Sequence, residues 1–442
     1  MGYHQRQQHL AQALRNQAGR GVRLNKQTSN LFRNRSTQDQ LLDVREFNHV
    51  LAIDPDTRII ETEGMVTYEA LVDASLRQGL MPAVVPQLKS ITIGGAVGGI
   101  GIESSSFRYG LPHETVLEMD VLLGSGKVIC CTPNNEHRDL FFGLANSYGT
   151  LGYILRLKIQ AIPVKPYVRL THVRCTDSPE FFDRINKACQ EPFDFVDGVV
   201  FAPGEHYLVL GEFTDDAPYT SDYSYLQIFY RSIRARSEDY LSVRDYLWRW
   251  DTDWFWCSKN LYAQNRVIRR LLGRKRLNSI TYQRVMRWNS RVGLTRRLGT
   301  LARRHHETVI QDVDIPLENA PAFLSFFQRE IGIHPIWICP ARHDGRHSHY
   351  PLFPMRDDTL YINFGFWDTV RTDPMHPQGH FNRMIEEKVT DLGGIKSLYS
   401  ESFYPQTEFW ELYGGHNYRL LKDRYDPDHA LKDLYQKCVL RQ

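Results

Sequence analysis

The chain has 442 residues, of which 42% are hydrophobic and 24% are charged, and its formal net charge at pH 7 is +3. This length allows two or three domains, and the composition is that of an ordinary globular enzyme. The seven cysteines show no Cys-x-x-Cys spacing and no run of about eighteen apolar residues occurs, so a disulfide framework, a zinc-cysteine site and a membrane-spanning helix are excluded.

The first 165 residues predict a mixed unit of short strands and few helices. Helices are expected over 10–17, 68–78 and 139–146, where apolar residues recur at helical spacing. Strands are expected over 21–25, 50–53, 58–63, 81–85, 116–123, 127–132 and 152–162. Short strands with few helices favour an α+β cofactor module over a doubly wound parallel sheet.

A second region, 166–410, contains two β-α-β-β runs on either side of an insertion at about 225–304. The first run covers 167–213, and the second covers 307–366, with a further helix over 381–392 and a strand-like segment over 395–403. This pattern predicts one antiparallel, ferredoxin-like sheet with helices on one face, which forms a cap over the first domain. The last segment, 411–442, is expected to be helical and to pack back on the first domain.

Charge is unevenly distributed along the chain. Residues 231–304 contain 19 Lys/Arg and 5 Asp/Glu, so this insertion carries +14 and the rest of the chain carries −11. The insertion also contains Trp248, Trp250, Trp254, Trp256 and Trp288. Two interpretations remain open: a solvated, largely helical face, or a surface that contacts an anionic membrane. No zinc-finger, heptad or RNA-binding motif supports a nucleic-acid partner.

The most informative local feature is glycine-rich. Five glycines precede a serine triplet within 94–106, directly after an apolar strand. Glycine allows close approach of a ligand to the backbone, and free N–H groups with hydroxyls form an anion-binding concavity, so we predict a loop that holds a phosphate or pyrophosphate. Tight-turn chemistry is the structural alternative. The spacing matches neither a P-loop nor a Rossmann fingerprint.

Three segments in this order resemble the FAD-binding domain of the vanillyl-alcohol-oxidase (PCMH) type: 92–104, 118–127 and 149–153. Further segments are similar to the Δ24-sterol reductase (Diminuto-like) branch. They are Gly101-Ile-Glu-Ser-Ser-Ser106 with Tyr109-Gly110, His305-His306, Val309, Gln311-Asp312, Pro335-Ile-Trp-Ile-Cys-Pro340 and Phe409-Trp410.

The resemblance implies that FAD is bound between the two halves of domain 1–165. It assigns residues 26–30 to a loop at the FAD diphosphate, in which many relatives carry a histidine that binds the flavin covalently. This loop has no histidine here, so we expect the FAD to be non-covalent. The residues assigned to FAD are Gln27, Thr28, Ser29, Asn30, Thr92, Ile93, Gly94, Gly95, Ala96, Gly98, Gly101, Ile102, Glu103, Ser104, Ser105, Gly149, Gly152, Tyr153 and Lys422.

The chemistry implied by the resemblance is reduction of an isolated carbon–carbon double bond of a lipid. Hydride from flavin N5 adds to one carbon, and an acid must lie close to the other, because positive charge develops on that carbon as it is protonated. The candidate acids are Tyr399, Tyr404, His334 and Glu408, each of which also has an ordinary structural role. No metal site is expected.

We favour a methylene-branched fatty acyl chain of a phospholipid over a sterol side chain, with NADPH or NADH as the reductant. The N-terminus lacks an apolar signal core, so we expect a cytoplasmic protein that contacts the inner face of the membrane through the basic insertion. Two alternatives remain: an FAD-dependent oxidase or dehydrogenase of an alcohol or lipid that passes electrons to O₂ or a quinone, and a non-catalytic lipid-surface protein.

Overall fold

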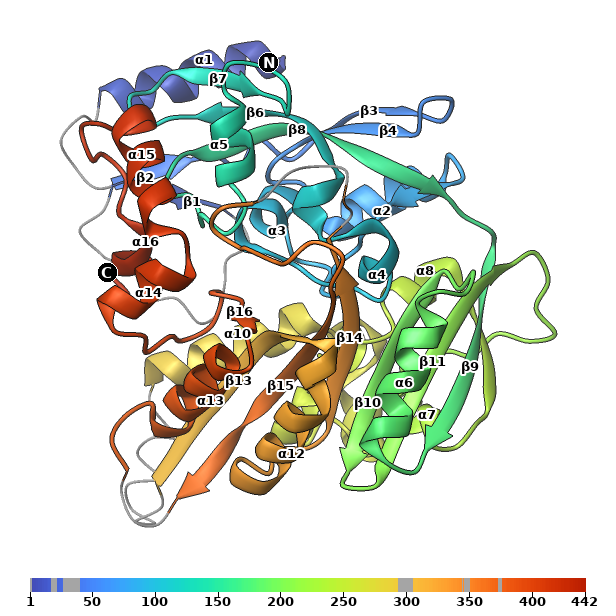
Figure 1. Ribbon diagram of the computed structural model, residues 1–442. Coiled ribbons are helices and arrows are strands. Elements are labelled where there is room, and N and C mark those ends of the chain that lie inside the picture. The colour runs from blue at the N-terminus through green and yellow to red at the C-terminus, as the bar shows by residue number, and fades with distance from the viewer. Residues whose placement is uncertain are drawn as a thin grey trace.

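The computed structural model describes residues 2–16, 22–26, 40–292, 305–343, 345, 350–372 and 376–442. These residues form two units, each built around a large antiparallel sheet, with the N-terminal unit in the upper part of Figure 1 and the second unit below it. The last strand of the first sheet ends at Pro163 and the second sheet begins at Tyr167. The α+β class predicted from the sequence is confirmed.

The sheet of the N-terminal unit is organised around β8 (Tyr153–Pro163). This strand pairs with β4 (Ile59–Glu63), β5 (Leu80–Pro82) and β6 (Val116–Leu122), while β3 (Val50–Asp54) and β7 (Val128–Cys131) lie outside them. Leu155, Leu157 and Ile159 are fully buried and alternate with half-buried residues, as expected for a strand with one face in the core. Helix α1 (Tyr3–Arg15) and the parallel pair β1 (Val22–Asn25) and β2 (Gln40–Asp43) complete this side.

Four helices connect these strands: α2 (Tyr68–Leu76), α3 (Ile93–Gly99), α4 (Ser106–Tyr109) and α5 (Arg138–Gly143). Helix α3 corrects the prediction of a loop, because the glycine-rich segment is helical over residues 93–99. Glycine is needed there for packing: the Gly94 N–H donates to the carbonyl oxygen of Gly64 at 2.9 Å, and a Cβ at Gly94 would lie 2.8 Å from the same oxygen. The absence of a side chain at Gly94 thus allows α3 to lie directly on the backbone that follows β4.

The second unit has an eight-stranded sheet in the order β12-β9-β11-β10-β14-β15-β13-β16, with every neighbouring pair antiparallel. Its strands are β9 (Tyr167–Cys175), β10 (Phe195–Ala202), β11 (Glu205–Thr214), β12 (Glu238–Ser242), β13 (His305–Pro316), β14 (Ile336–Arg342), β15 (Leu360–Thr372) and β16 (Ile395–Lys396). The pairing of β10 with β14 joins the two β-α-β-β runs into one sheet.

Side-chain alternation divides this sheet into two faces. On β14, Ile336 and Ile338 pack with helices α6 (Ser178–Ala188), α12 (Ala320–Glu330) and α13 (His380–Asp391), which cover the outer face in Figure 1. Trp337 and Cys339 point to the other face and belong to the core shared with the N-terminal unit. The inner face of the sheet is therefore the surface that meets the N-terminal unit.

The insertion lies against the inner face. It contains α7 (Phe229–Ile233), α8 (Val243–Leu247), α9 (Arg266–Leu272), α10 (Ser279–Val292) and the short 3₁₀ helices η2 (Asp251–Asp253), η3 (Cys257–Leu261) and η4 (Arg274–Arg276). The expectation of a largely helical block misses β12, which pairs with β9 at the sheet edge. Trp250, Phe255 and Trp256 are buried: Trp250 packs on Phe255 and Trp256, and these two pack with Trp337 and Trp367. Most of the predicted aromatic surface is thus internal core.

The C-terminal segment contains α14 (Gln406–Leu412), α15 (Gly415–Tyr425) and α16 (Leu434–Cys438) and lies beside the N-terminal unit, coloured red in Figure 1. Leu421 of α15 packs on Gly143 of α5, where a Cβ would lie 2.3 Å from Leu421 Cδ1. Arg424 reinforces this contact through Asp139 at 2.8 Å. Every helix of the described residues is too short or too polar to cross a lipid bilayer.

Candidate functional site

A cavity of about 590 Å³ lies between the two units. Its floor is formed by α3, by the residues that follow this helix and by the turn before β8. Its roof is formed by the inner face of the second sheet and by the insertion. The volume and the position between two domains are typical of a cofactor or substrate site.

Ten of the predicted cofactor residues line this cavity. At Gly98, a Cβ would meet no atom nearer than 4.0 Å and would project into the open space, so the glycine leaves room for a ligand against the backbone. Gly149 has φ of +75°, a conformation that favours glycine, and it turns the chain beside Tyr153. The ten residues are Thr92, Gly94, Gly95, Ala96, Gly98, Gly101, Ile102, Gly149, Gly152 and Tyr153.

Other predicted cofactor residues have different positions. Ile93 belongs to the hydrophobic core and is 1% exposed. Gln27, Thr28, Ser29 and Asn30 lie outside the described residues. The neighbouring Lys26 is described and lines the cavity, so the chain reaches the site just before this segment.

Glu103, Ser104 and Ser105 need correction as cofactor residues, because they lie behind the cavity wall. Glu103 is buried and accepts hydrogen bonds from Gln87 Nε2 at 2.5 Å and from the Ser104 backbone N–H at 2.8 Å. Ser105 Oγ donates to the carbonyl oxygen of Ala83 at 2.9 Å. Their polar groups hold the end of the glycine-rich segment in place, and none of the three is in the described lining of the cavity.

The assignment of Lys422 to the cofactor also needs correction, because its ammonium group is bound by other groups of the protein. Its ammonium group donates to the carbonyl oxygens of Thr150 at 2.8 Å and Leu431 at 2.7 Å, and it pairs with Asp426 at 2.6 Å. An ammonium group has three N–H donors, and these three partners satisfy them. Lys422 joins α15 to the turn that precedes β8 and does not line the described part of the cavity.

The cavity contains basic residues that the sequence did not indicate. Arg23 lies on β1 and Lys26 directly follows this strand, while Lys432 and Lys437 come from the C-terminal segment. Lys437 donates to the carbonyl oxygen of Tyr148 at 2.6 Å, which holds it beside the turn at Gly149. These four positive charges, with the backbone N–H groups of the glycine-rich floor, suit an anionic diphosphate.

The roof is aromatic and apolar. Trp254 and Phe255 come from the insertion, Trp337 from β14 and Trp367 from β15. The rings of Phe255 and Trp367 lie 4.4 Å apart between centroids. Stacked and tilted rings of this kind make a water-poor surface suited to a planar ring or an apolar chain.

Of the four candidate acids, the structure brings only Tyr399 to the described cavity lining. Tyr404 is buried beside Tyr413, and Glu408 is bound to Arg383 at 2.5 Å. The Nδ1 atom of His334 lies 3.3 Å from the carbonyl oxygen of Gly332, before the start of β14. Tyr404, Glu408 and His334 are corrected on this ground: none of the three is in the described lining of the cavity.

Asp312 is a cavity residue that sequence reasoning did not single out as functional. It lies on β13 and forms a hydrogen bond with the Tyr399 hydroxyl, and its Oδ1 atom has no hydrogen-bond partner among the described residues. Burial raises the pKa of Asp312 to about 7. The sequence signal was its place in the family-like pair Gln311-Asp312, but residue spacing alone does not show which face of the strand meets the cavity.

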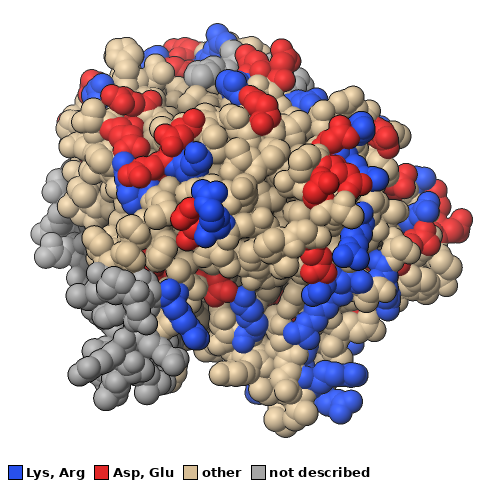
Figure 2. Space-filling model, turned by 60° about the horizontal axis from the view of Figure 1, so that its bottom comes forward, with Lys and Arg blue, Asp and Glu red and all other residues tan. Residues whose placement is uncertain are grey.

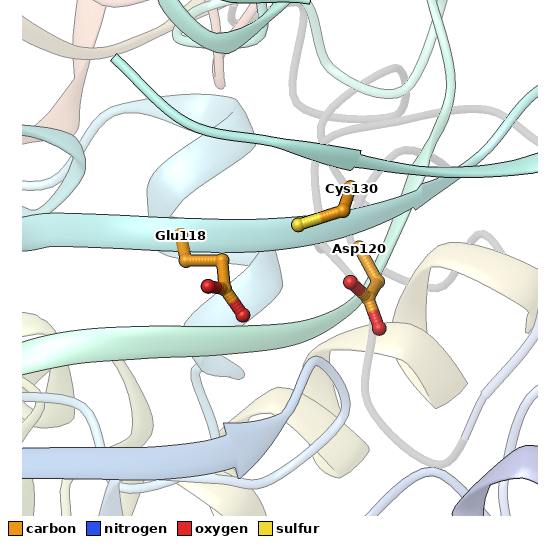
Figure 3. Close-up of side chains that lie close together, drawn as sticks. All are labelled: Glu118, Asp120 and Cys130. Carbon is orange, nitrogen blue, oxygen red and sulfur yellow. The ribbon is translucent and has the colours of Figure 1, made fainter. Parts of the chain in front are cut away.

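One group of side chains outside the cavity has metal-ligand chemistry: Glu118, Asp120 and Cys130 lie close together on adjacent strands (Figure 3). The Arg156 guanidinium already neutralises both carboxylates, with Nη2 2.6 Å from Glu118 Oε1 and Nε 2.8 Å from Asp120 Oδ2. A cation would have to displace this arginine, so the cluster is a salt-bridge network of the sheet.

A glycine-rich floor with basic residues, facing an aromatic roof on a second domain, defines a protein that binds an extended anionic cofactor with a planar ring. Residues 5–132 match the family model of the FAD binding domain. The chain is 26% identical over 402 residues to the Delta(24)-sterol reductases of Homo sapiens and Mus musculus, which covers 88% of this chain and 75% of each relative. The Delta(24)-sterol reductase of Arabidopsis thaliana is 24% identical over 436 residues, which covers 90% and 76%.

These comparisons confirm the resemblance predicted from the sequence. The chain carries an FAD-binding domain and is similar over most of its length to Delta(24)-sterol reductases. It is an FAD-dependent oxidoreductase.

The described residues fit FAD. The room at Gly98 and the donors of the floor suit a diphosphate that lies against the backbone, and Arg23, Lys26, Lys432 and Lys437 supply opposite charge. The aromatic roof provides the apolar cover that an isoalloxazine ring requires.

Proposed function

We propose that this protein reduces an isolated carbon–carbon double bond of a lipid, with non-covalent FAD as cofactor and NADPH or NADH as reductant. The observation that carries the proposal is the cavity itself, in which a glycine-rich FAD floor faces an aromatic roof that contains the acid pair Asp312 and Tyr399. The similarity to enzymes named sterol reductases supports the same type of reaction. Within the lipid class we favour a methylene-branched fatty acyl chain of a phospholipid over a sterol side chain.

When bound and reduced, FAD would supply a hydride to one carbon of the double bond. The chain itself contributes three functions around that chemistry. Thr92, Gly98 and Lys437 belong to the groups that would hold the cofactor, while Trp337 and Trp367 cover the apolar substrate and exclude water. Tyr399 provides an O–H group on the roof, on the side of the cavity opposite the floor.

The test is reduction of the purified, FAD-loaded protein under anaerobic conditions. Addition of NADPH or NADH is expected to bleach the yellow flavin absorbance. A phospholipid that carries a methylene-branched acyl chain should then restore the absorbance and yield the saturated branched chain, detected by mass spectrometry.

The controls separate this proposal from the alternatives. A phospholipid with the matching saturated chain must leave the reduced flavin unchanged. If the nicotinamide fails to bleach the flavin while a lipid alcohol does so, the protein is an oxidase or dehydrogenase. If the flavin absorbance is restored by a sterol with a side-chain double bond and not by the phospholipid, the substrate is a sterol.

We further propose that the protein works as a cytoplasmic enzyme at an anionic membrane face. Residues 254–288 contain nine Lys/Arg and no Asp/Glu. Seven large hydrophobic side chains of this segment are exposed: Tyr262, Val267, Leu271, Ile280, Val285, Met286 and Trp288. We call these side chains and their basic neighbours the basic–apolar surface. Charge is uneven on the face seen in Figure 2: Asp and Glu lie mainly in the upper half, interspersed with Lys and Arg, whereas the charged side chains of the lower half are mostly Lys and Arg.

The basic–apolar surface is continuous with the cavity. Leu261, Gln283 and Met286 line the cavity, and Met286 is also 37% exposed. An acyl chain that leaves a bilayer beneath this surface would therefore meet apolar side chains along its path to the roof. Anionic lipid headgroups would be matched by the surrounding arginines.

A further inference from the structure

Asp312 and Tyr399 form a buried pair on the roof of the cavity. Successive residues of a strand point to opposite faces, so Asp312 shares the inner face of β13 with Ile310 and Asp314, whereas Val309 and Val313 pack under the outer helices. In the strand register, Asp312 and Trp337 both lie opposite Gly365. A Cβ at Gly365 would lie 2.7 Å from Asp312 Oδ1 and 2.5 Å from Trp367, so this glycine makes room for both side chains.

The Tyr399 hydroxyl has a defined set of partners. It accepts a hydrogen bond from Trp367 Nε1 at 2.9 Å, and it is hydrogen-bonded to the Asp312 carboxyl. A phenolic oxygen offers one O–H donor and two acceptor sites. If Asp312 is ionised, the Tyr399 O–H must donate to the carboxylate. If Asp312 is protonated, its own O–H donates to Tyr399, both acceptor sites are filled, and the Tyr399 O–H is released for another acceptor.

We propose that protonated Asp312 acts as a positioning residue that makes Tyr399 the proton donor to the substrate carbon. This inference deepens the proposed function, because it names the groups that deliver the proton. The Tyr399 O–H bond breaks as a new C–H bond forms, and the Trp367 N–H and the Asp312 O–H stabilise the phenolate oxygen. The proton of Asp312 then passes to Tyr399, and Asp312 regains a proton from solvent.

The atoms and electrons of the alkene reduction balance. The π bond of the alkene breaks and two C–H bonds form, one with the hydride and its electron pair and one with the proton from Tyr399. The two electrons come through FAD from the nicotinamide named above, and the net proton comes from solvent. No additional oxidant or reductant is required.

The surroundings support the neutral form of Asp312. Burial raises its pKa to about 7, and burial also raises the pKa of Asp314, two residues further along the same face, to about 8. Two lysines of neighbouring elements are matched by carboxylates: Lys396, opposite Val313 in the register, pairs with Glu386 at 2.6 Å, and Lys259 pairs with Asp368 of β15 at 2.6 Å. The titratable and charged groups around the pair are Asp314, Tyr148, Lys259 with Asp368, and Lys396 with Glu386.

The pH dependence follows from this assignment. The active form is protonated, so the rate of proton delivery is full below pH 7 and falls as pH rises through about 7. In the wild-type protein, reoxidation of NADPH-reduced flavin by the lipid alkene should slow about tenfold per pH unit above that midpoint. The Asp312→Asn variant should lose this dependence, and Tyr399→Phe should be slower by roughly 10²-fold or more at every pH. Bleaching of the flavin by NADPH should be unchanged in both variants.

A second readout does not depend on activity. Infrared spectroscopy of the FAD-loaded wild-type protein should show the carbonyl band of a protonated carboxylic acid that disappears with a midpoint near pH 7. In Asp312→Asn the component with the midpoint near pH 7 should be absent, while buried Asp314, whose pKa is raised to about 8, should keep its own carbonyl component. The component with the midpoint near pH 7 should persist in the matched control Asp314→Asn, which removes a buried carboxyl of the same strand face and should also keep the pH-dependent rate.

Failure of the proposed function and failure of the role of Asp312 and Tyr399 give different results. If no lipid alkene reoxidises the flavin but the Asp312 band titrates as described, the proposed function fails while the protonated pair stands. If the band is missing from the wild-type protein, or if Asp312→Asn retains the pH-dependent rate, the inference is overturned. A normal rate in Tyr399→Phe would also overturn it.

Discussion

At the scale of single residues, the contacts of a buried charged side chain show its role in this protein, and Lys422 is an example. Lys422 is 4% exposed, and its ammonium group is bound by Asp426 and by the carbonyl oxygens of Thr150 and Leu431. Asp426 in turn accepts hydrogen bonds from the backbone N–H groups of Ala430 and Leu431. The pair therefore fixes the path of the chain after α15, beside the turn that precedes β8.

We predict that Lys422→Met lowers stability without changing the flavin chemistry. Removing one partner of a buried ion pair leaves Asp426 without its counter-charge, which costs about 3–5 kcal/mol. Chemical denaturation should show this loss, and the exposed-residue control Lys127→Met should stay within about 0.5 kcal/mol of wild type. The visible spectrum of bound FAD and its reduction by NADPH should match wild type in both variants. A shifted FAD spectrum in Lys422→Met would show that Lys422 contacts the flavin and would contradict this prediction.

Residue patterns explain which site residues could be predicted. The ten cavity-floor residues lie within 92–102 and 149–153, two short segments on which the family resemblance rests, so they could be assigned from the sequence. The roof could not, because Asp312, Trp337 and Trp367 are brought together only by the pairing of three strands. The resemblance assigns Glu103 to the cofactor together with its segment, whereas the structure places Glu103 near Arg249, a residue far away in the chain that the sequence does not link to it.

At the scale of elements, the insertion has a buried part and an exposed part. Trp250, Phe255 and Trp256 belong to the core, whereas α9, η4 and α10 present basic and apolar side chains to solvent. The sequence indicated the charge of the whole block, but it did not separate these two parts. Burial of an aromatic side chain depends on the inner face of a sheet whose strands come from elsewhere in the chain.

We predict that the basic–apolar surface binds anionic vesicles. Arg270, Lys275 and Arg284 are exposed, and each basic residue near an anionic membrane contributes about 1 kcal/mol of attraction. The variant R270E/K275E/R284E should therefore bind phosphatidylglycerol vesicles at least roughly 100-fold more weakly than wild type in a sedimentation assay. Neither protein should bind pure phosphatidylcholine vesicles strongly.

A matched control changes the same net charge elsewhere. R77E/K127E/R174E replaces three exposed basic residues, which lie directly after α2, in the β6–β7 turn and on β9. It should bind phosphatidylglycerol vesicles nearly as well as wild type. Equal loss in both variants would show that net charge, and not this surface, controls the interaction.

At the scale of the whole molecule, Arg249 joins the FAD floor to the second sheet. Its side chain is fully buried, with Nη2 2.9 Å from Asp197 Oδ2 on β10 and 3.5 Å from Glu103 Oε1 at the end of the glycine-rich segment. The guanidinium carbon also lies 4.0 Å from the centre of the Tyr246 ring. Asp197 is further bound by Trp337 Nε1 at 3.1 Å. One arginine thus connects floor, insertion and roof.

We predict that Arg249→Met weakens both folding and FAD binding. Two buried carboxylates lose their counter-charge, which costs about 3–5 kcal/mol, and the floor loses its attachment to the roof. FAD release, followed by the rise in free-flavin fluorescence, should occur at a lower temperature or denaturant concentration than in wild type.

The control lies at the same junction. Arg108 pairs with Asp194 at 3.5 Å, but this pair is partly exposed to solvent, so Arg108→Met should cost no more than about 1 kcal/mol. If Arg249→Met retained FAD as well as Arg108→Met does, Arg249 would not contribute to FAD binding, and the prediction would be contradicted.

The eight-stranded sheet has a consequence for synthesis of the protein on the ribosome. Strand β10 pairs with β14, and the whole insertion together with β13 lies between them in the chain. A nascent chain that has completed β9, β10 and β11 therefore presents unpaired β10 backbone groups and apolar side chains until β14 emerges. Translation of this protein thus creates an interval in which a half-sheet must be kept from aggregation, and the roof of the FAD site is completed only after that interval, when Trp367 of β15 and Tyr399 have been added.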